Sequence, residues 1–285
     1  MRILVFHGYL LEGTGSNVYN ARLAETLARL GHEVHLLSQE RHAAELPFVD
    51  AVGDWDAGAL RVRAVRAAGA RAGSCTVYRP DIGGLLPVYV ADRYEGIEAR
   101  TFARCSDAEV QRYVQANVAA VREVNELADP ALALANHLVM GPVVLARALD
   151  GEVPYAVKIH GSALEYTVKP QPERFLPYAR EGLAGARAIL VGSRHTAASL
   201  WQALPTEPLA GRTRLGPRAW MCSASRRASP RRPPRSCRGW RRRCARRRLP
   251  RATPTARSRA MPGRAPRRSR ACSPAPSSWS RSWAS

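Results

Sequence analysis

The feature that most constrains this chain is a change of composition at Pro217. From Pro217 to Ser285 there are 21 Arg but no Lys, Asp or Glu, and Leu249 is the only Leu. The segment also lacks Val, Ile, Phe, Tyr, Asn, Gln and His. Such a segment cannot bury enough apolar surface to offset the backbone entropy lost on folding. We therefore predict one globular domain over 1–216 and a disordered basic tail over 217–285.

The tail carries all of the formal charge of +21, because 23 Lys and Arg balance 23 Asp and Glu before Pro217. A basic tail can bind nucleic acid by neutralising phosphates, or it can bind an acidic membrane surface. A shifted reading frame of GC-rich DNA also yields mainly Arg, Ala, Pro, Ser, Gly, Cys and Trp. Composition alone leaves these three explanations open, but the third can be tested within the sequence.

The codons of three tail residues favour the frameshift. Trp220 and Met221 have unique codons, TGG and ATG, and the codon of Cys222 begins with TG. Read one base earlier, these bases encode Asp and then Val. With GC-leaning codons elsewhere, the stretch from Pro217 to Ser225 becomes Pro-Gly-Val-Asp-Val-Gln-Arg-Phe. We interpret the tail as a frameshift product, so that its charge says little about partners.

Residues 1–216 show no feature of a secreted, metal-binding or membrane-spanning chain. Cys75 and Cys105 have no metal-ligand spacing and favour a reduced, cytoplasmic setting. The longest apolar stretch, 131–149, is interrupted by four residues that a membrane span excludes. They are Asn136, His137, Pro142 and Arg147.

Short apolar runs alternate with helical patterns along 1–216. The predicted strands cover 3–6, 33–37, 60–65, 75–79, 86–90, 131–135, 156–159, 187–191 and 212–215. The predicted helices cover 17–30, 140–149, 173–184, 194–203 and a long segment to about 128 that opens at the capping box Ser106-Asp107-Ala108-Glu109. Repeated strand–helix units predict an α/β fold with a Rossmann-like, doubly wound and mostly parallel sheet.

The first predicted helix has recognisable ends and an apolar face. Ser16 is placed to cap its N-terminus, and Gly31 to end it. Leu23, Leu27 and Leu30 recur at helical spacing and are predicted to face the core.

Ligands of doubly wound sheets bind at the carboxyl ends of the strands, which selects the loop 7–16 first. Gly13, Gly15 and Ser16 lie there before a helix N-terminus, where backbone N–H groups can approach an anion. Val18 replaces the last glycine of a dinucleotide fingerprint, and no Lys follows to make a P-loop. The loop is predicted to face a phosphate or a sugar, the alternative being a turn without a ligand.

Polar residues follow three other predicted strands at the same edge. Asn136-His137 and His160 can contact sugar hydroxyls, and His160 can also act as an acid or base; a structural hydrogen bond is the alternative. Arg194 can meet a phosphate, whereas Ser193 can simply cap the next helix. The polar cluster 92–95 is either a surface loop or an acceptor contact.

These motifs together resemble the N-terminal half of GT-B glycosyltransferases of the large retaining family 4. The resemblance covers about 1–216 and rests on Arg2–His7, Gly13–Ser16, Leu30–Val34, Ile159–Ser162 and Ala188–Ser193. In that family a Pro-Gly-Val-Asp-x-x-x-Phe segment then leads into the C-terminal domain. The neighbouring frame offers this segment at the break, so the family pattern and the codons agree.

The resemblance implies an acceptor-side domain of an enzyme that moves a hexose from a nucleotide sugar to an acceptor hydroxyl with retention. It implies no metal and no other cofactor. The resemblance implies Gly13 and Gly15 near the donor diphosphate and His160 at the transferred sugar. We predict Ser16 and Arg194 as further residues of the phosphate cleft, and Asn136, His137, Gly161 and Ser162 as sugar or acceptor contacts.

The chain departs from the family in its last quarter. The second domain normally supplies an Arg/Lys pair for the diphosphate and a Glu-x7-Glu motif, but no Glu follows Glu207. We therefore predict a truncated glycosyltransferase that is inactive alone, because the charges that stabilise the leaving diphosphate are missing. The predicted partners are a nucleotide sugar and an unknown acceptor, with no specific nucleic acid and with peripheral membrane contact as an option. The alternatives are a nucleic-acid-binding protein acting through the tail and a nicotinamide-dependent Rossmann enzyme, against which Val18 argues.

Overall fold

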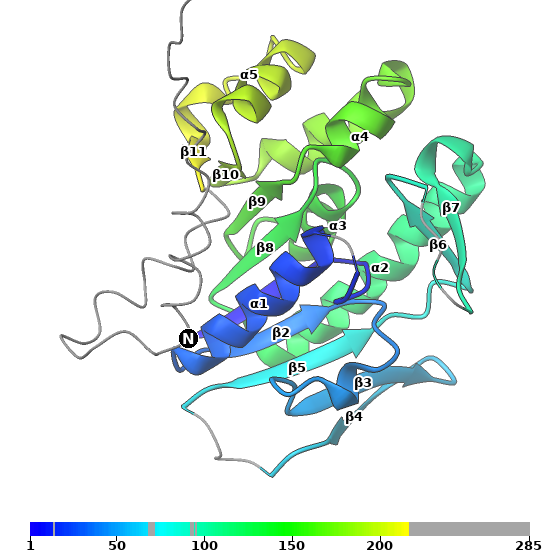
Figure 1. The fold of residues 1–285 in the computed structure, drawn as a ribbon, viewed down its shortest axis with the longest axis vertical. Coiled ribbons are helices and arrows are strands. Elements are labelled where there is room, and N and C mark those ends of the chain that lie inside the picture. Colours follow the sequence, from blue (N-terminus) through cyan, green and yellow to red (C-terminus); the bar gives the residue numbers. More distant parts are fainter. Residues whose placement is uncertain (14, 68–71, 92–93, 95, 217–285) are drawn as a thin grey trace, which may run out of the picture. The chain divides into compact units, whose positions relative to one another are not determined.

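The computed structural model describes residues 1–13, 15–67, 72–91, 94 and 96–216. The predictions for the tail, and those for 92, 93 and 95 of the polar cluster, lie outside the described residues. Figure 1 shows a twisted central sheet with helices on both of its faces. In the part of the chain that is described, no helix combines the length and the apolar character that crossing a bilayer requires.

The elements follow the alternation that the sequence predicts. The strands are β1 (Arg2–Phe6), β2 (Glu33–Leu37), β3 (Ala51–Asp56), β4 (Ala59–Ala64), β5 (Ser74–Arg79), β6 (Leu85–Val88), β7 (Glu98–Thr101), β8 (Leu132–Asn136), β9 (Tyr155–Ile159), β10 (Ala188–Val191) and β11 (Thr213–Leu215). The α-helices are α1 (Gly15–Arg29), α2 (Asp107–Ala128), α3 (Gly141–Leu149), α4 (Pro172–Ala184) and α5 (Arg194–Ala203). Shorter helical turns are η1 (Ala43–Glu45), η2 (Phe102–Arg104), η3 (Leu164–Val168) and η4 (Ala210–Arg212).

The main sheet has the order β11-β10-β9-β8-β1-β2-β5-β3-β4. Its neighbouring strands are parallel except for the antiparallel pair β3 and β4. Strand β1 pairs with β2 on one side and with β8 on the other, so the strand order reverses there. This confirms the predicted mostly parallel, doubly wound sheet, and it places the point where such sheets bind ligands at the carboxyl ends of β1 and β8.

The two faces of the sheet build two separate apolar cores. Ile3 and Val5 of β1 pack with Ala21, Ala24 and Ala28 of α1 and with β2 and β5. Leu4 and Phe6 point to the opposite face and join the core that contains the apolar side chains of α2, α3 and α4. Because side chains alternate along a strand, an almost continuous apolar run is what a strand covered on both faces requires.

Helix α1 differs from the prediction in its first residue and in its buried face. It begins at Gly15, so Ser16 lies inside its first turn and does not precede the helix as its cap. Leu30 is 66% exposed and Leu23 and Leu27 are only half-buried, although Leu27 packs against the core. The buried residues of the helix are alanines and two asparagines. Alanines let the helix lie close to the sheet. Gly31 ends the helix with a φ of +88°, as predicted.

Strands β3 and β7 and the π-helical turn η3 are absent from the prediction. The sequence of β3 contains Gly53 and two Asp, and β7 reads Glu-Ala-Arg-Thr, so neither shows an apolar run. β3 is held by pairing on both sides, with β5 and β4. Tertiary pairing therefore overrides a weak local pattern in these segments.

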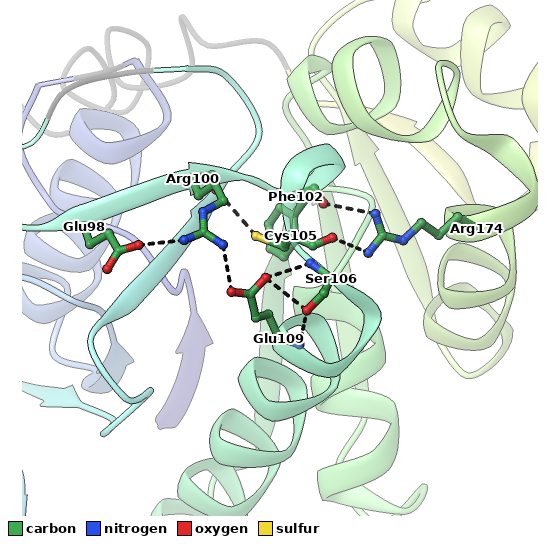
Figure 2. Close-up of polar contacts among 7 residues, drawn as sticks. All are labelled: Glu98, Arg100, Phe102, Cys105, Ser106, Glu109 and Arg174. Atoms are coloured by element: carbon green, nitrogen blue, oxygen red, sulfur yellow. Dashed lines mark hydrogen bonds and ion pairs between the residues drawn. The ribbon is translucent and has the colours of Figure 1, made fainter.

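The capping box at the start of α2 is confirmed. Ser106 Oγ accepts from Glu109 N over 3.2 Å, and Glu109 Oε2 accepts from Ser106 N over 2.7 Å. Figure 2 shows that Arg100 of β7 also bonds Glu109, and that Arg174 of α4 donates to Cys105 O over 2.6 Å. The same few residues thus tie together β7, the start of α2 and α4.

A buried histidine anchors the loop between β1 and α1. His7 Nδ1 accepts from Asn20 Nδ2 over 3.0 Å, so Nε2 carries the proton and lies 3.0 Å from Leu10 O and 3.1 Å from Asn17 Oδ1. Asn17 Nδ2 in turn donates to Glu12 O over 2.7 Å. Burial lowers the pKa of His7 to about 4, with its hydrogen bonds to Asn17 and Leu10 opposing the shift. The ring is neutral at pH 7 and fixes the path of the loop.

Replacing Ser106 by Ala is expected to lower the free energy of unfolding by about 1 kcal/mol, because a helix N-cap is lost. Ser106→Thr keeps a hydroxyl that can cap and is the matched control. Urea denaturation followed by circular dichroism measures both variants. Equal stability of Ser106→Ala and the parent would show that the cap contributes nothing.

His7 is expected to make stability depend on pH. In the unfolded state the His7 ring binds a proton near pH 6.5, whereas in the folded state it does so only near pH 4. The contribution of His7 to the free energy of unfolding is therefore fully present above pH 6.5 and is lost as the pH falls from 6.5 to 4. The full loss is about 3 kcal/mol. The measurement compares unfolding free energies between pH 4.5 and 7 for the parent and for His7→Asn, with the exposed His42→Asn as control.

If His7→Asn does not fold, ¹⁵N NMR of the imidazoles in the parent gives the same answer. His7 should stay neutral with its proton on Nε2 at pH 5. A His7 that is protonated at pH 5 would contradict the assignment.

Candidate functional site

The loop after β1 brings backbone groups to the switch point between β1 and β8. Gly8 has a φ of +73°, and a Cβ at this position would lie 2.7 Å from Tyr113 Oη, so only glycine fits. Gly13 also has a positive φ, of +88°, but it has open space around it. Gly15 is the first residue of α1, and its N–H belongs to the unpaired end of the helix, where partial positive charge favours anions.

Asn136 joins the carboxyl ends of β1, β8 and β9. Its Nδ2 donates to Phe6 O over 3.2 Å, and its Oδ1 lies 2.8 Å from His160 Nε2. Because Oδ1 is an acceptor, His160 Nε2 carries the ring proton. The ring of Tyr19 from α1 meets His160 edge-on at 5.2 Å between centroids. Asn136 and Tyr19 therefore set the tautomer and the orientation of His160.

His137 is buried among aromatic rings beside His160. It has a left-handed φ of +68°, and neither of its ring nitrogens has a hydrogen-bond partner within the described residues. Its ring centroid lies 4.3 Å from that of Tyr89 and 4.9 Å from that of His160. Burial, reinforced by His160 and His7, holds the pKa of His137 well below its ordinary value. The ring is therefore neutral at pH 7.

These groups line a pocket of about 420 Å³ at the switch point, which we call the central pocket. Its size lies within the range of about 300–1,000 Å³ that is usual for small-molecule sites. Its described lining includes Tyr9, Tyr89 and Tyr94 but no Asp, Glu, Lys or Arg. Burial raises the pKa of Tyr9 and of Tyr89 well above the ordinary value, so these phenols are neutral as well.

The central pocket gathers many, but not all, of the predicted site residues. Those that line it are Gly15, Ser16, His137, His160 and Ser162. Asn136 is not among the lining residues but hydrogen-bonds His160, which is one of them. Gly161 forms the turn between His160 and Ser162 with a φ of +93°. Gly13 and Arg194 are exposed and are not among the lining residues. Ser193 caps α5 by accepting from Thr196 N over 3.1 Å, which confirms its structural interpretation.

The sequence reasoning missed Tyr9, Tyr89 and Asn17 in the lining. Tyr89 directly follows β6, and its position after an apolar strand is a signal that could have been used. Tyr94 belongs to the polar cluster in which an acceptor contact was considered. Among the described residues, no three His, Cys, Asp or Glu side chains gather in a way that could hold a metal ion.

Comparison with known proteins gives one family. The profile of the family described as "Glycosyl transferase 4-like domain" matches residues 14–210. No curated protein matches the chain.

Several solved structures share parts of the fold at low identity. The sucrose-phosphate synthase of Thermosynechococcus elongatus has a TM-score of 0.46 and 15% identity, over 76% of this chain and 47% of its own. UGT2 of Phytolacca americana, complexed with UDP-2-fluoro-glucose and pterostilbene, has a TM-score of 0.41 and 12% identity, and the match covers 76% of this chain and 53% of that structure. The UDP-GlcNAc 2-epimerase of Neisseria meningitidis, bound to UDP-GlcNAc, has a TM-score of 0.40 and 11% identity, and the match covers 75% of this chain and 45% of that structure.

The chain thus spans about half the length of these structures. The family match covers most of the described residues and agrees with the resemblance found in the motifs. The chain therefore belongs to the glycosyl transferase 4-like domain family.

Proposed function

We propose that residues 1–216 form the acceptor-side domain of a GT-B glycosyltransferase that moves a hexose from a nucleotide sugar to an acceptor hydroxyl with retention. Family membership supports the reaction class. The observation that carries the proposal is the Asn136–His160 hydrogen bond, which fixes a histidine beside the N-terminus of α1 at the switch point. A sugar that bears a diphosphate matches these two features, because His160 can bind sugar hydroxyls and the N-terminus of α1 favours anions.

In this proposal His160 contacts a hydroxyl of the transferred hexose. Its protonated Nε2 is held by Asn136 Oδ1, so the rest of the ring is presented to the pocket in one fixed orientation. Contacts held in advance at the reacting centre lower the barrier, because no group has to reorganise during the step. Ser162 and His137 are proposed to contact the sugar or the acceptor from the same wall.

The donor diphosphate is proposed to lie at the start of α1. Gly15 and Ser16 line the pocket there, and Gly13 can present its backbone to a phosphate without a side chain in the way. Arg194, at the start of α5, is proposed as an outer phosphate contact that reaches the donor from beyond the pocket lining.

The Arg/Lys pair and the Glu-x7-Glu motif are proposed to belong to a second domain. The gene of this chain is proposed to encode that domain in another reading frame. The Arg-rich sequence from Pro217 and the lack of Glu after Glu207 support this, and they predict that the chain alone does not catalyse transfer. The family match favours neither a nucleic-acid-binding protein nor a nicotinamide-dependent enzyme.

The coding DNA provides the first test. The frame one base earlier is expected to continue without stop codons from Pro217 and to encode a Glu-x7-Glu motif. The chain as given should show no transfer from UDP-, GDP- or ADP-hexoses, whereas the chain with the restored frame should be active. Stop codons in that frame, or transfer by the chain as given, would contradict this part of the proposal.

Variants of the restored chain test the site itself. His160→Ala is expected to lower kcat about 100-fold or more. Asn136→Ala should lower it about tenfold, because His160 remains but loses the partner that orients it. His195→Ala, an exposed histidine on α5, is the control. A His160→Ala enzyme with the parent's kcat would remove His160 from the proposed site.

A further inference from the structure

A second pocket lies at the same edge of the sheet, beyond the central pocket. Arg79 ends β5, Asp54 pairs with it in register on β3, and Gln39 follows β2. These side chains line a pocket of about 260 Å³ together with Arg41, Trp55 and Asp81, which we call the arginine pocket. Its volume lies just below the range for drug-sized ligands and suits one small ring.

The arginine pocket combines cations and anions in equal number. Its charged lining residues are Arg41, Arg79, Asp54 and Asp81. Arg79 Nε donates to Asp54 Oδ1 over 2.9 Å, and Asp81 Oδ1 accepts from Gly83 N over 3.0 Å. The pocket therefore offers several N–H donors beside several carboxylate oxygens, with no excess charge of either sign among the described lining residues.

Two further groups are held in place by hydrogen bonds. Trp55 Nε1 donates to Glu123 Oε2 over 2.6 Å, which fixes the indole ring at the wall of the pocket. Gln39 Nε2 donates to Pro80 O over 2.9 Å, which leaves its Oε1 as the acceptor. A fixed aromatic ring beside planar donors and acceptors gives a ligand both an apolar surface and oriented hydrogen bonds.

The two pockets are neighbours. Gln39 N donates to Tyr9 O over 2.9 Å, and Tyr9 lines the central pocket. Leu86 and Val88, two residues apart on β6, line the arginine pocket and the central pocket respectively. The two pockets thus adjoin the same short stretch of β6.

We propose that the arginine pocket is a second subsite that holds a neutral sugar unit of the acceptor, so that this enzyme extends an existing glycan. The inference rests on the proposed glycosyltransferase function. Sugar hydroxyls donate and accept, and so they match the mixed lining, while the C–H face of a sugar ring can pack on Trp55. A phosphate or carboxylate only accepts hydrogen bonds, so it would match the arginines but leave the oxygens of Asp54 and Asp81 without a donor.

The test uses the full chain and a printed array of neutral and acidic glycans, followed by titration of a bound neutral oligosaccharide and of the matching methyl monosaccharide. Arg41→Ala and Asp54→Asn should each weaken oligosaccharide binding about tenfold and leave monosaccharide binding unchanged. Arg61→Ala is the control, because Arg61 is an exposed arginine of β4 outside the pocket lining. Titration with UDP-, GDP- and ADP-hexoses tests the donor site separately, and His160→Ala should weaken that binding.

The outcomes separate this inference from the proposed function. Oligosaccharide binding that is unchanged in Arg41→Ala and Asp54→Asn, or no binding to any glycan, would overturn the second subsite and leave the proposed function standing. Nucleotide-sugar binding that is insensitive to His160 would overturn the proposed site at His160 and, with it, the assignment of the arginine pocket to an acceptor. Preference for acidic glycans that is lost in Arg41→Ala would overturn the assignment to a neutral sugar.

Discussion

The fold depends on the position of β1 between β2 and β8. Four of its five residues are buried, and they alternate between two apolar cores. The chain can cover both faces only by winding helices in two directions from this strand, which opens a crevice at its carboxyl end. His7, the first residue after β1, fixes the path of the loop that leads into α1 and so gives this crevice a defined shape.

The central pocket and the arginine pocket differ in their electrostatics although they share one sheet edge. Burial holds the pKa of His137 low and the pKa values of Tyr9 and Tyr89 high, so these groups of the central pocket are neutral. The polarity of the pocket comes from hydrogen-bonding groups and from the start of α1. The arginine pocket instead carries full charges that balance one another. In these two proposals the transferred hexose of the donor lies in the neutral central pocket, and the neutral sugar of the acceptor lies in the charge-balanced arginine pocket beside it.

Much of this fold could be predicted from the sequence. Strands such as β1 and β2 show apolar runs, and the capping box of α2 is read directly from Ser106 and Glu109. β3 and β7 could not be predicted, because neither shows an apolar run and pairing with β4, β5 and β6 holds them in place. The leucine face expected on α1 is confirmed only in part, because Leu27 packs against the core while Leu30 is exposed and alanines form the most buried part of the face.

The candidate site could be predicted in part. The strand ends at Asn136, His137 and His160 follow from the rule for doubly wound sheets, and Tyr9 lies in the loop 7–16 that the same rule selects. Tyr89 required knowledge of how β6 folds against that edge. NMR of the ¹⁵N-labelled full chain, titrated with UDP-, GDP- and ADP-hexoses, tests the central claim most directly. We expect at least one of them to shift the signals of Gly15, Ser16, His160 and Ser162. Shifts confined to residues away from the central pocket, or no shift with any of these sugars, would contradict the account.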